Sequence, residues 1–299
     1  MLLAGRALGG GVAYTWESLP NARDGVIALL GSLVNPPYVR RTSAAVIASK
    51  NLRPTALVSA RQLAGVLSWE VDILRYTLGA EDHAVDALTM LSKVIGLRKG
   101  RSVFMRLRRE EEFRGNAHKG GFFTSYEQTL FERTFEVEIP AQDMFGSLKQ
   151  VGHEDAFPLF RLYCAATPSK VRSHQGMTFE MWASSREPSR RDTEEWVFYS
   201  DNMARGWVRT AKRGLRGELE LMVHPDDEVE LTRRLLDFSL SRFNVSQKLY
   251  MMTAEYQVVP ARLAAQRGFR ACSDFSVLAK SLSVKERLDE TSPLTVVSR

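Results

Sequence analysis

The sequence of 299 residues has few of the residues on which secreted scaffolds, metalloproteins and membrane proteins depend. Its two cysteines, Cys164 and Cys272, form no disulfide framework and lie in no metal-ligand spacing. Its five histidines show no zinc-binding pattern, so we expect no metal site. No run of about 18 apolar residues occurs, which argues against a membrane span. The Gly-rich start is interrupted by Arg6 and does not resemble a secretory signal, so we expect a cytoplasmic protein.

The basic residues are scattered along the sequence and are not gathered on one helix. Lys and Arg exceed Asp and Glu by 41 to 35, a net charge of +6 that favours anionic partners in general. The basic residues form short clusters, at 98–101, 106–109 and 212–216, with no interleaved aromatic residues. We interpret these clusters as solvated faces and expect no nucleic-acid partner. Phosphate loops of the Walker kind and nucleophile elbows are missing as well.

The hydrophobic content of 44% is enough for two cores of about 150 residues each. From Ser43 onward, alternation and helical periodicity predict the order β-β-β-α-β-α-β. The strands are expected at 43–50, 55–64, 67–76, 102–107 and 122–133, and the helices at 81–97 and 110–119.

The same order is predicted a second time. The second set has strands at 196–200, 204–211, 217–224, 248–253 and 269–281, and helices at 227–243 and 259–266, with a further helix at 154–163 before them. Both sets end their short helix with a Gly-Phe step, Gly121-Phe122 and Gly268-Phe269. The repetition predicts two tandem domains, 1–140 and 150–299, joined through a segment that contains Pro140 and Gly146.

These residues carry a resemblance to the GNAT acyltransferase family. In the second half a strand ending in Val223-His224-Pro225 leads into a long helix, and the Gly-Phe step and a final strand follow. The first half resembles the same pattern without the Val-x-Pro step. The resemblance implies an α/β (α+β) fold of two tandem GNAT-like domains. Each is expected to have a mixed, mostly antiparallel twisted sheet with a V-shaped splay, flanked by helices.

The resemblance also implies a cofactor, acetyl-CoA or another acyl-CoA. In the family, two parallel strands separate and the pantetheine arm pairs with the exposed backbone. The diphosphate lies at the start of the following helix, where amide groups and the helix dipole favour an anion. Carried onto this sequence, the expected cofactor-binding residues are Leu221, Met222, Val223, His224, Val229, Leu231 and Arg233.

The cofactor loop departs from the family pattern in both halves. The family glycines correspond to Val229, Leu231 and Arg233, and two basic positions correspond to Glu228 and Glu230. Carboxylates stabilise a helix start. Near a diphosphate they repel it, by about 1 kcal/mol for each charge pair at about 4 Å in water. Helix capping and a modified cofactor site therefore both remain possible interpretations of this loop.

Glu218 and Glu220 are the candidates for a general base. They lie two apart on a strand, so both carboxylates face one way while Leu219, Leu221 and Val223 face the other. The alternative is an exposed sheet face on which they pair with arginines, and Arg205, Arg209 and Arg213 are available for this.

The candidate general acid is less clear, because alanines, Ala117 and Ala264, stand where many family members have a catalytic tyrosine. Tyr256 lies nearby and could replace it, or it could be a packing residue.

Two functions follow from the resemblance. The first is an acyl-CoA-dependent N-acyltransferase (acetyltransferase) that acts on a small-molecule or peptide amine, with the C-terminal domain carrying the site. The alternative is a catalytically inactive binding or structural protein that keeps the fold. The two copies further predict either a monomer with an internal pseudo-dimer or a homodimer.

Overall fold

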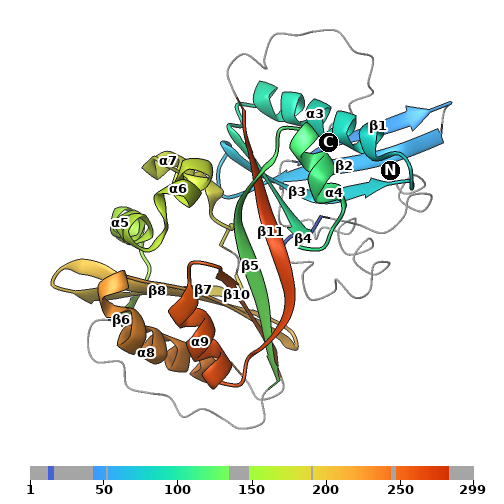
Figure 1. Ribbon diagram of the computed structural model, residues 1–299. Coiled ribbons are helices and arrows are strands. Elements are labelled where there is room, and N and C mark those ends of the chain that lie inside the picture. Colours follow the sequence, from blue (N-terminus) through green and yellow to red (C-terminus); the bar gives the residue numbers. More distant parts are fainter. Residues whose placement is uncertain are drawn as a thin grey trace. The chain divides into compact units, whose positions relative to one another are not determined.

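The structure is a computed structural model that describes residues 13–16, 43–51, 53–134, 148–189, 191–243 and 247–282. The chain divides into two compact units (Figure 1). Unit 1 takes the described residues up to Ser125, the segment Ser184–Glu187 and the residues from Ser276 onward. Unit 2 comprises Tyr126–Ala183 and Pro188–Phe275. The Gly-rich start and most of the expected interdomain segment lie outside the described residues.

Unit 1 begins with an antiparallel meander followed by a long helix. Its elements are β1 (Ser43–Lys50), β2 (Arg53–Gln62), β3 (Ser68–Tyr76), α3 (Glu81–Leu97), β4 (Ser102–Arg108) and α4 (Phe113–Lys119). β4 is parallel to β3, and α3 provides the crossover that two parallel neighbours require. The buried side of α3 carries Ala84, Leu88, Leu91 and Ile95, whose spacing of three and four places them on one face of the helix. They pack with Trp69 into one hydrophobic core.

A short segment from the middle of the chain completes unit 1. Ser184 Oγ accepts hydrogen bonds from the amides of Leu67 and Ser68, at 3.0 and 3.1 Å. The amides of Ala64 and Gly65 donate to carbonyls of this segment. The segment therefore satisfies backbone groups of the turn between β2 and β3 that would otherwise lack partners.

Unit 2 repeats the meander, long helix and parallel return. Its elements are β6 (Leu148–Gln150), η2 (His153–Asp155), α5 (Ala156–Ala166), α6 (Ser169–Gln175), α7 (Phe179–Ser185), β7 (Thr193–Ser200), β8 (Met203–Arg213), β9 (Arg216–Val223), η3 (Pro225–Asp227), α8 (Glu228–Ser241), β10 (Lys248–Ala254) and α9 (Val258–Gln266). The strand order is β10-β9-β8-β7-β6. β9 and β10 are parallel and the other pairs are antiparallel.

The sheet of unit 2 has a hydrophobic cluster on each face. On one face α8 and α9 cover Leu219, Leu221 and Val223. Gly206 of β8 permits the close approach of α8, because a Cβ at this position would lie 2.6 Å from the Leu235 side chain. On the other face α5 and α7 contribute an aromatic cluster with Trp182. The alternation along β9 therefore separates the two faces as predicted.

The two long closing strands, β5 (Phe123–Thr134) and β11 (Arg270–Ser281), do not follow the expected division at residues 140–150. β5 follows α4 of unit 1 in the sequence, yet its residues from Tyr126 belong to unit 2, where Gln128–Thr134 pair with β10. β11 follows α9 of unit 2, and its residues from Ser276 belong to unit 1, where Leu278 enters the core. Each unit is thus completed by a strand that follows the other unit's short helix.

Candidate functional site

β9 and β10 of unit 2 separate at their carboxyl ends. Their parallel pairing runs from Arg216↔Lys248 to Leu219↔Met251 and goes no further among the described residues. β9 continues to Val223 and β10 to Ala254. The strands therefore open as the V-shaped splay predicted from the sequence, and we call this opening the unit 2 gap.

The side chain of Gln257 spans the unit 2 gap. Its Nε2 donates to the carbonyl of Leu221 at 3.2 Å, and its Oε1 accepts from the amide of Ala254 at 2.9 Å. One carboxamide thus satisfies a backbone acceptor on β9 and a backbone donor on β10. Sequence reasoning did not single out Gln257, because its position after β10 gains a role only from the gap beside it.

The predicted cofactor residues on β9 lie beside the gap. Leu221 and Val223 point into the core, and Met222 packs against the aromatic cluster on the other face. Any contact of Leu221 and Val223 with a ligand in the gap would therefore involve their backbone groups. His224 follows at the end of β9, where its Nδ1 accepts from the amide of Asp226 at 3.3 Å.

The predicted cofactor residues on α8 differ in their surroundings. Val229 is exposed, and Leu231 is buried against Gly206. Arg233 is exposed and forms an ion pair with Glu230. At this end of α8 the carboxylates of Asp226 and Asp227 lie 3.6 and 2.6 Å from the guanidinium of Arg205. An arginine therefore offsets part of the negative charge that the sequence places there.

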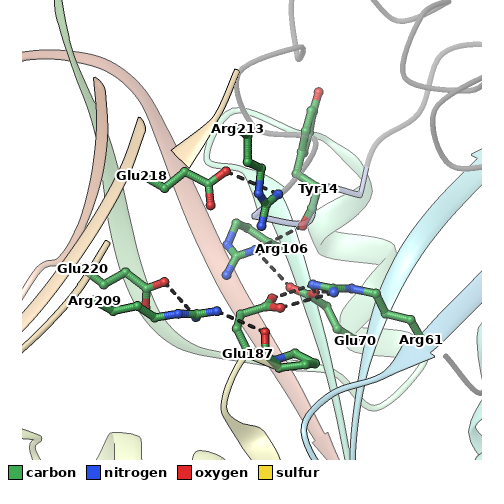
Figure 2. A network of polar contacts seen from close by, with 10 residues as sticks. Tyr14, Arg61, Glu70, Arg106, Glu187, Arg209, Arg213, Glu218 and Glu220 are labelled. Carbon is green, nitrogen blue, oxygen red and sulfur yellow. Dashed lines mark hydrogen bonds and ion pairs between the residues drawn. The ribbon is translucent and has the colours of Figure 1, made fainter. Parts of the chain in front are cut away.

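Glu218 and Glu220 project from the same face of β9 into different environments (Figure 2). The Glu218 side chain is 3% exposed and lies 3.4 Å from Arg213 and 2.7 Å from Arg216. The Glu220 side chain is 32% exposed and lies 3.3 Å from Arg209. Two of the arginines that the sequence offered as partners, Arg209 and Arg213, therefore pair with these glutamates. The face is not exposed at Glu218, and Glu220 is the more accessible carboxylate.

Burial raises the pKa of the Glu218 carboxyl, although the guanidinium groups of Arg216 and Arg213 oppose the shift. A carboxyl whose pKa is higher in the folded state adds stability below its unfolded pKa, and this stability is lost as the pH rises through the folded value. We therefore expect the free energy of unfolding of the wild type to fall relative to Glu218→Gln as the pH increases. Urea unfolding between about pH 4 and pH 8 measures this difference. Parallel curves for the two proteins would contradict it.

Tyr256 lies directly after β10, in a cluster of tyrosines. Its ring centroid is 6.0 Å from that of Tyr126, whose hydroxyl accepts from Gln175 Nε2 at 2.7 Å. Burial raises the pKa of the Tyr256 phenol, and the neighbouring Tyr126 adds to the shift. A phenol with a raised pKa is a weaker proton donor, so this environment favours packing over general acid catalysis.

Comparison with solved structures relates this arrangement to known proteins. A GCN5-related N-acetyltransferase from Sphaerobacter thermophilus matches with a TM-score of 0.54 at 12% identity, covering 86% of each chain. A tandem GNAT protein from the clavulanic acid biosynthesis pathway matches with a TM-score of 0.50 at 14% identity, covering 85% of this chain and 87% of its own. The fold is the GNAT fold. No protein-family model and no curated protein matches the sequence.

Unit 1 has the GNAT gap as well, with a different set of polar contacts. β3 and β4 pair from Ser68↔Ser102 to Glu70↔Phe104. Glu70 therefore corresponds to Glu218, whose partner in register is Tyr250.

Glu70 is buried in a network of arginines (Figure 2). Arg61 Nε donates to its carboxylate at 3.0 Å, and Arg106 Nη1 does so at 3.0 Å. Arg61 also contacts Glu187 at 2.5 Å. Both GNAT units thus place a buried, doubly paired glutamate at the same position of the sheet.

The residues that the structure describes contain neither a candidate metal centre nor a candidate membrane-spanning helix. These residues include no group of three or more His, Cys, Asp or Glu side chains placed to hold a metal ion. In the same residues no helix combines the length and the apolar character needed to cross a membrane.

Proposed function

We propose that the protein is an acyl-CoA-dependent N-acyltransferase whose site lies in unit 2, with acetyl-CoA or another acyl-CoA as donor and an amine as acceptor. The observation that carries the proposal is the gap between β9 and β10, directly before the long helix α8. Backbone groups at such a gap can pair with an extended amide-containing arm. The start of α8 offers amides to an anion, and Arg205 offsets the nearby carboxylates.

The contacts of Gln257 support an amide-binding gap. Its carboxamide donates to one strand and accepts from the other, and each amide of a pantetheine arm offers the same two groups. When bound, the cofactor would supply an activated acyl group as a thioester. The backbone of Leu221, Met222 and Val223 would hold the arm. Glu220 lies on the face of β9 opposite to Leu221 and Val223. It would accept a proton from the ammonium group of the acceptor, directly or through water, and the resulting neutral amine could then attack the thioester carbonyl.

An inactive GNAT-fold protein is the second candidate, and specific contacts favour it. Glu218 is held by two arginines, and Gln257 already satisfies backbone groups of the gap. The exposed Glu230 near the start of α8 would repel a diphosphate. Under this hypothesis the chain would bind no acyl-CoA, and Glu220 would have no chemical role.

Titration calorimetry with acetyl-CoA tests the proposal. We expect one bound molecule per chain and tighter binding by Gln257→Ala, because an arm entering the wild-type gap must first displace two hydrogen bonds. At about 0.5–1.5 kcal/mol each, the loss of both hydrogen bonds corresponds to a gain in affinity of roughly 5-fold to 160-fold.

Gln247→Ala is the matched control. It also removes a side-chain hydrogen bond to a backbone carbonyl, that of Gly214 at 3.0 Å, but it lies at the start of β10, away from the gap. Its affinity should equal that of the wild type. If neither the wild type nor Gln257→Ala binds acetyl-CoA at millimolar concentration, the inactive alternative holds.

A further inference from the structure

The gap of unit 1 contains a piece of the chain itself. Ala13 forms an antiparallel bridge with Leu107 near the end of β4. The amide of Tyr14 donates to the carbonyl of Arg106 at 2.9 Å. The pairing of β4 with β3 has already ended at Phe104, two residues before Arg106. The segment Ala13–Trp16 is therefore joined to β4 by an antiparallel bridge, beyond the point where β3 separates from β4.

The backbone of β4 indicates on which side this strand lies. The amide of Ser102, the first residue of β4, donates to the carbonyl of Leu67, just before β3. In a strand, the backbone groups of residues an even number apart point to the same side. Arg106 lies four residues after Ser102, so its carbonyl points toward β3. The segment Ala13–Trp16 therefore occupies the gap.

Side chains hold the segment as well. Ala13 belongs to the hydrophobic core of unit 1, and Trp16 is 6% exposed. The guanidinium of Arg108 lies 5.6 Å from the centroid of the Tyr14 ring, a cation–π contact. The segment is therefore held by two buried side chains and a cation–π contact in addition to its backbone pairing.

Arg106 connects the segment to Glu70 (Figure 2). Its Nη1 donates to the carbonyl of Tyr14 at 3.3 Å and to the carboxylate of Glu70 at 3.0 Å. Glu70 corresponds in register to Glu218 of unit 2. In unit 1, the buried glutamate of the GNAT sheet thus fixes an arginine that binds a peptide carbonyl.

We propose that the gap of unit 1 is a peptide-binding site, which takes an extended strand where unit 2 has its candidate acyl-CoA site, and that Ala13–Trp16 is its resident ligand. Backbone pairing with β4 supplies binding, and the buried positions of Ala13 and Trp16 supply sequence preference. Unit 1 therefore binds no acyl-CoA while the segment is in place. This inference does not depend on the catalytic activity of unit 2.

Amide hydrogen exchange of the wild-type protein gives the first test. A peptide bond N–H that is paired with β4 exchanges only when the segment opens. We expect the Tyr14 amide to exchange at least about tenfold more slowly than in a synthetic peptide of residues 11–18. Equal rates in the protein and in the free peptide would overturn the proposal. The measurement needs no substitution, so it decides the question even if a variant fails to fold.

The second test supplies the segment in trans. Tyr14→Pro removes the N–H that pairs with Arg106, and Tyr14→Phe keeps it as the matched control. A fluorescein-labelled peptide of residues 11–18 should bind Tyr14→Pro at least about tenfold more tightly than the wild type or Tyr14→Phe, in which the gap is filled. The same peptide with proline in place of Tyr14 should bind none of them. Equal binding of the labelled peptide by all three proteins would refute a site specific for this segment. Because acetyl-CoA is not used, failure of the proposed function would leave these results unchanged.

Discussion

Arg267→Ala is expected to lower the free energy of unfolding of unit 2 by about 3 kcal/mol, the lower end of the range for breaking a buried ion pair. Arg267, at the end of α9, contacts both oxygens of Asp237 on α8, at 2.5 and 2.7 Å. The Asp237 side chain is 4% exposed, so removal of its partner leaves a carboxylate in an apolar surrounding. Arg267 itself is 30% exposed, so water reaches part of the ion pair. For this reason the expected loss of stability lies at the lower end of the range.

Two further variants separate this effect from a general loss of charge. Arg267→Lys keeps the charge but cannot form the bidentate contact with Asp237, so we expect an intermediate loss in the free energy of unfolding. Arg233→Ala breaks the exposed pair with Glu230 on the same helix and should change stability by no more than about 1 kcal/mol. Urea unfolding followed by fluorescence measures all three. Equal losses for Arg267→Ala and Arg233→Ala would show that the burial of Asp237 contributes nothing.

Much of the fold could be predicted because strands and helices here follow simple periodicities. Leu219, Leu221 and Val223 alternate with polar residues, and the structure places them in the core under α8. The repeated order of elements predicted two equivalent units, and the structure pairs Glu70 with Phe104 in one unit as it pairs Glu218 with Tyr250 in the other. Local patterns thus identified the repeated unit and the parallel strands that form its gap.

The missed features depend on information that local patterns do not contain. The sequences of β5 and β11 both predict strands, but they do not indicate which sheet edge each strand joins. The assignment of these strands across the two units was therefore not predicted. The helices α6 and α7 have seven residues each, too short for a clear amphipathic period.

The same limit applies to the candidate site. The sequence identified Glu218, Glu220 and the arginines of β8, because alternation fixes which face of a strand they occupy. It could not identify Gln257 or the segment Ala13–Trp16, because their contacts join residues that are far apart in the sequence or follow from the gap itself.

If unit 2 is the acyltransferase, the largest loss of activity is expected from Glu220→Gln. General base catalysis contributes about 10²–10⁴-fold, so kcat should fall by that factor while KM changes little. Glu220 is a better candidate than Glu218 because its side chain is 32% exposed, whereas that of Glu218 is 3% exposed and is held by Arg213 and Arg216. It also follows the last residue of β9 that pairs with β10. Initial-rate measurements over a series of pH values, with acetyl-CoA and a panel of amines, provide the test.

The repeat supplies a matched control for this substitution. Asp72 lies two residues after Glu70 in the sequence, as Glu220 lies two after Glu218, and it lies at a register shift of β3 against β2, between Val71↔Ala60 and Ile73↔Ser59. Asp72 accepts a hydrogen bond from Ser59 Oγ at 2.5 Å, and the gap of its own unit is filled by Ala13–Trp16. Asp72→Asn should therefore leave kcat unchanged. A comparable loss of kcat in both variants would show that the activity does not depend on unit 2 alone. Full activity of Glu220→Gln would exclude Glu220 as the general base.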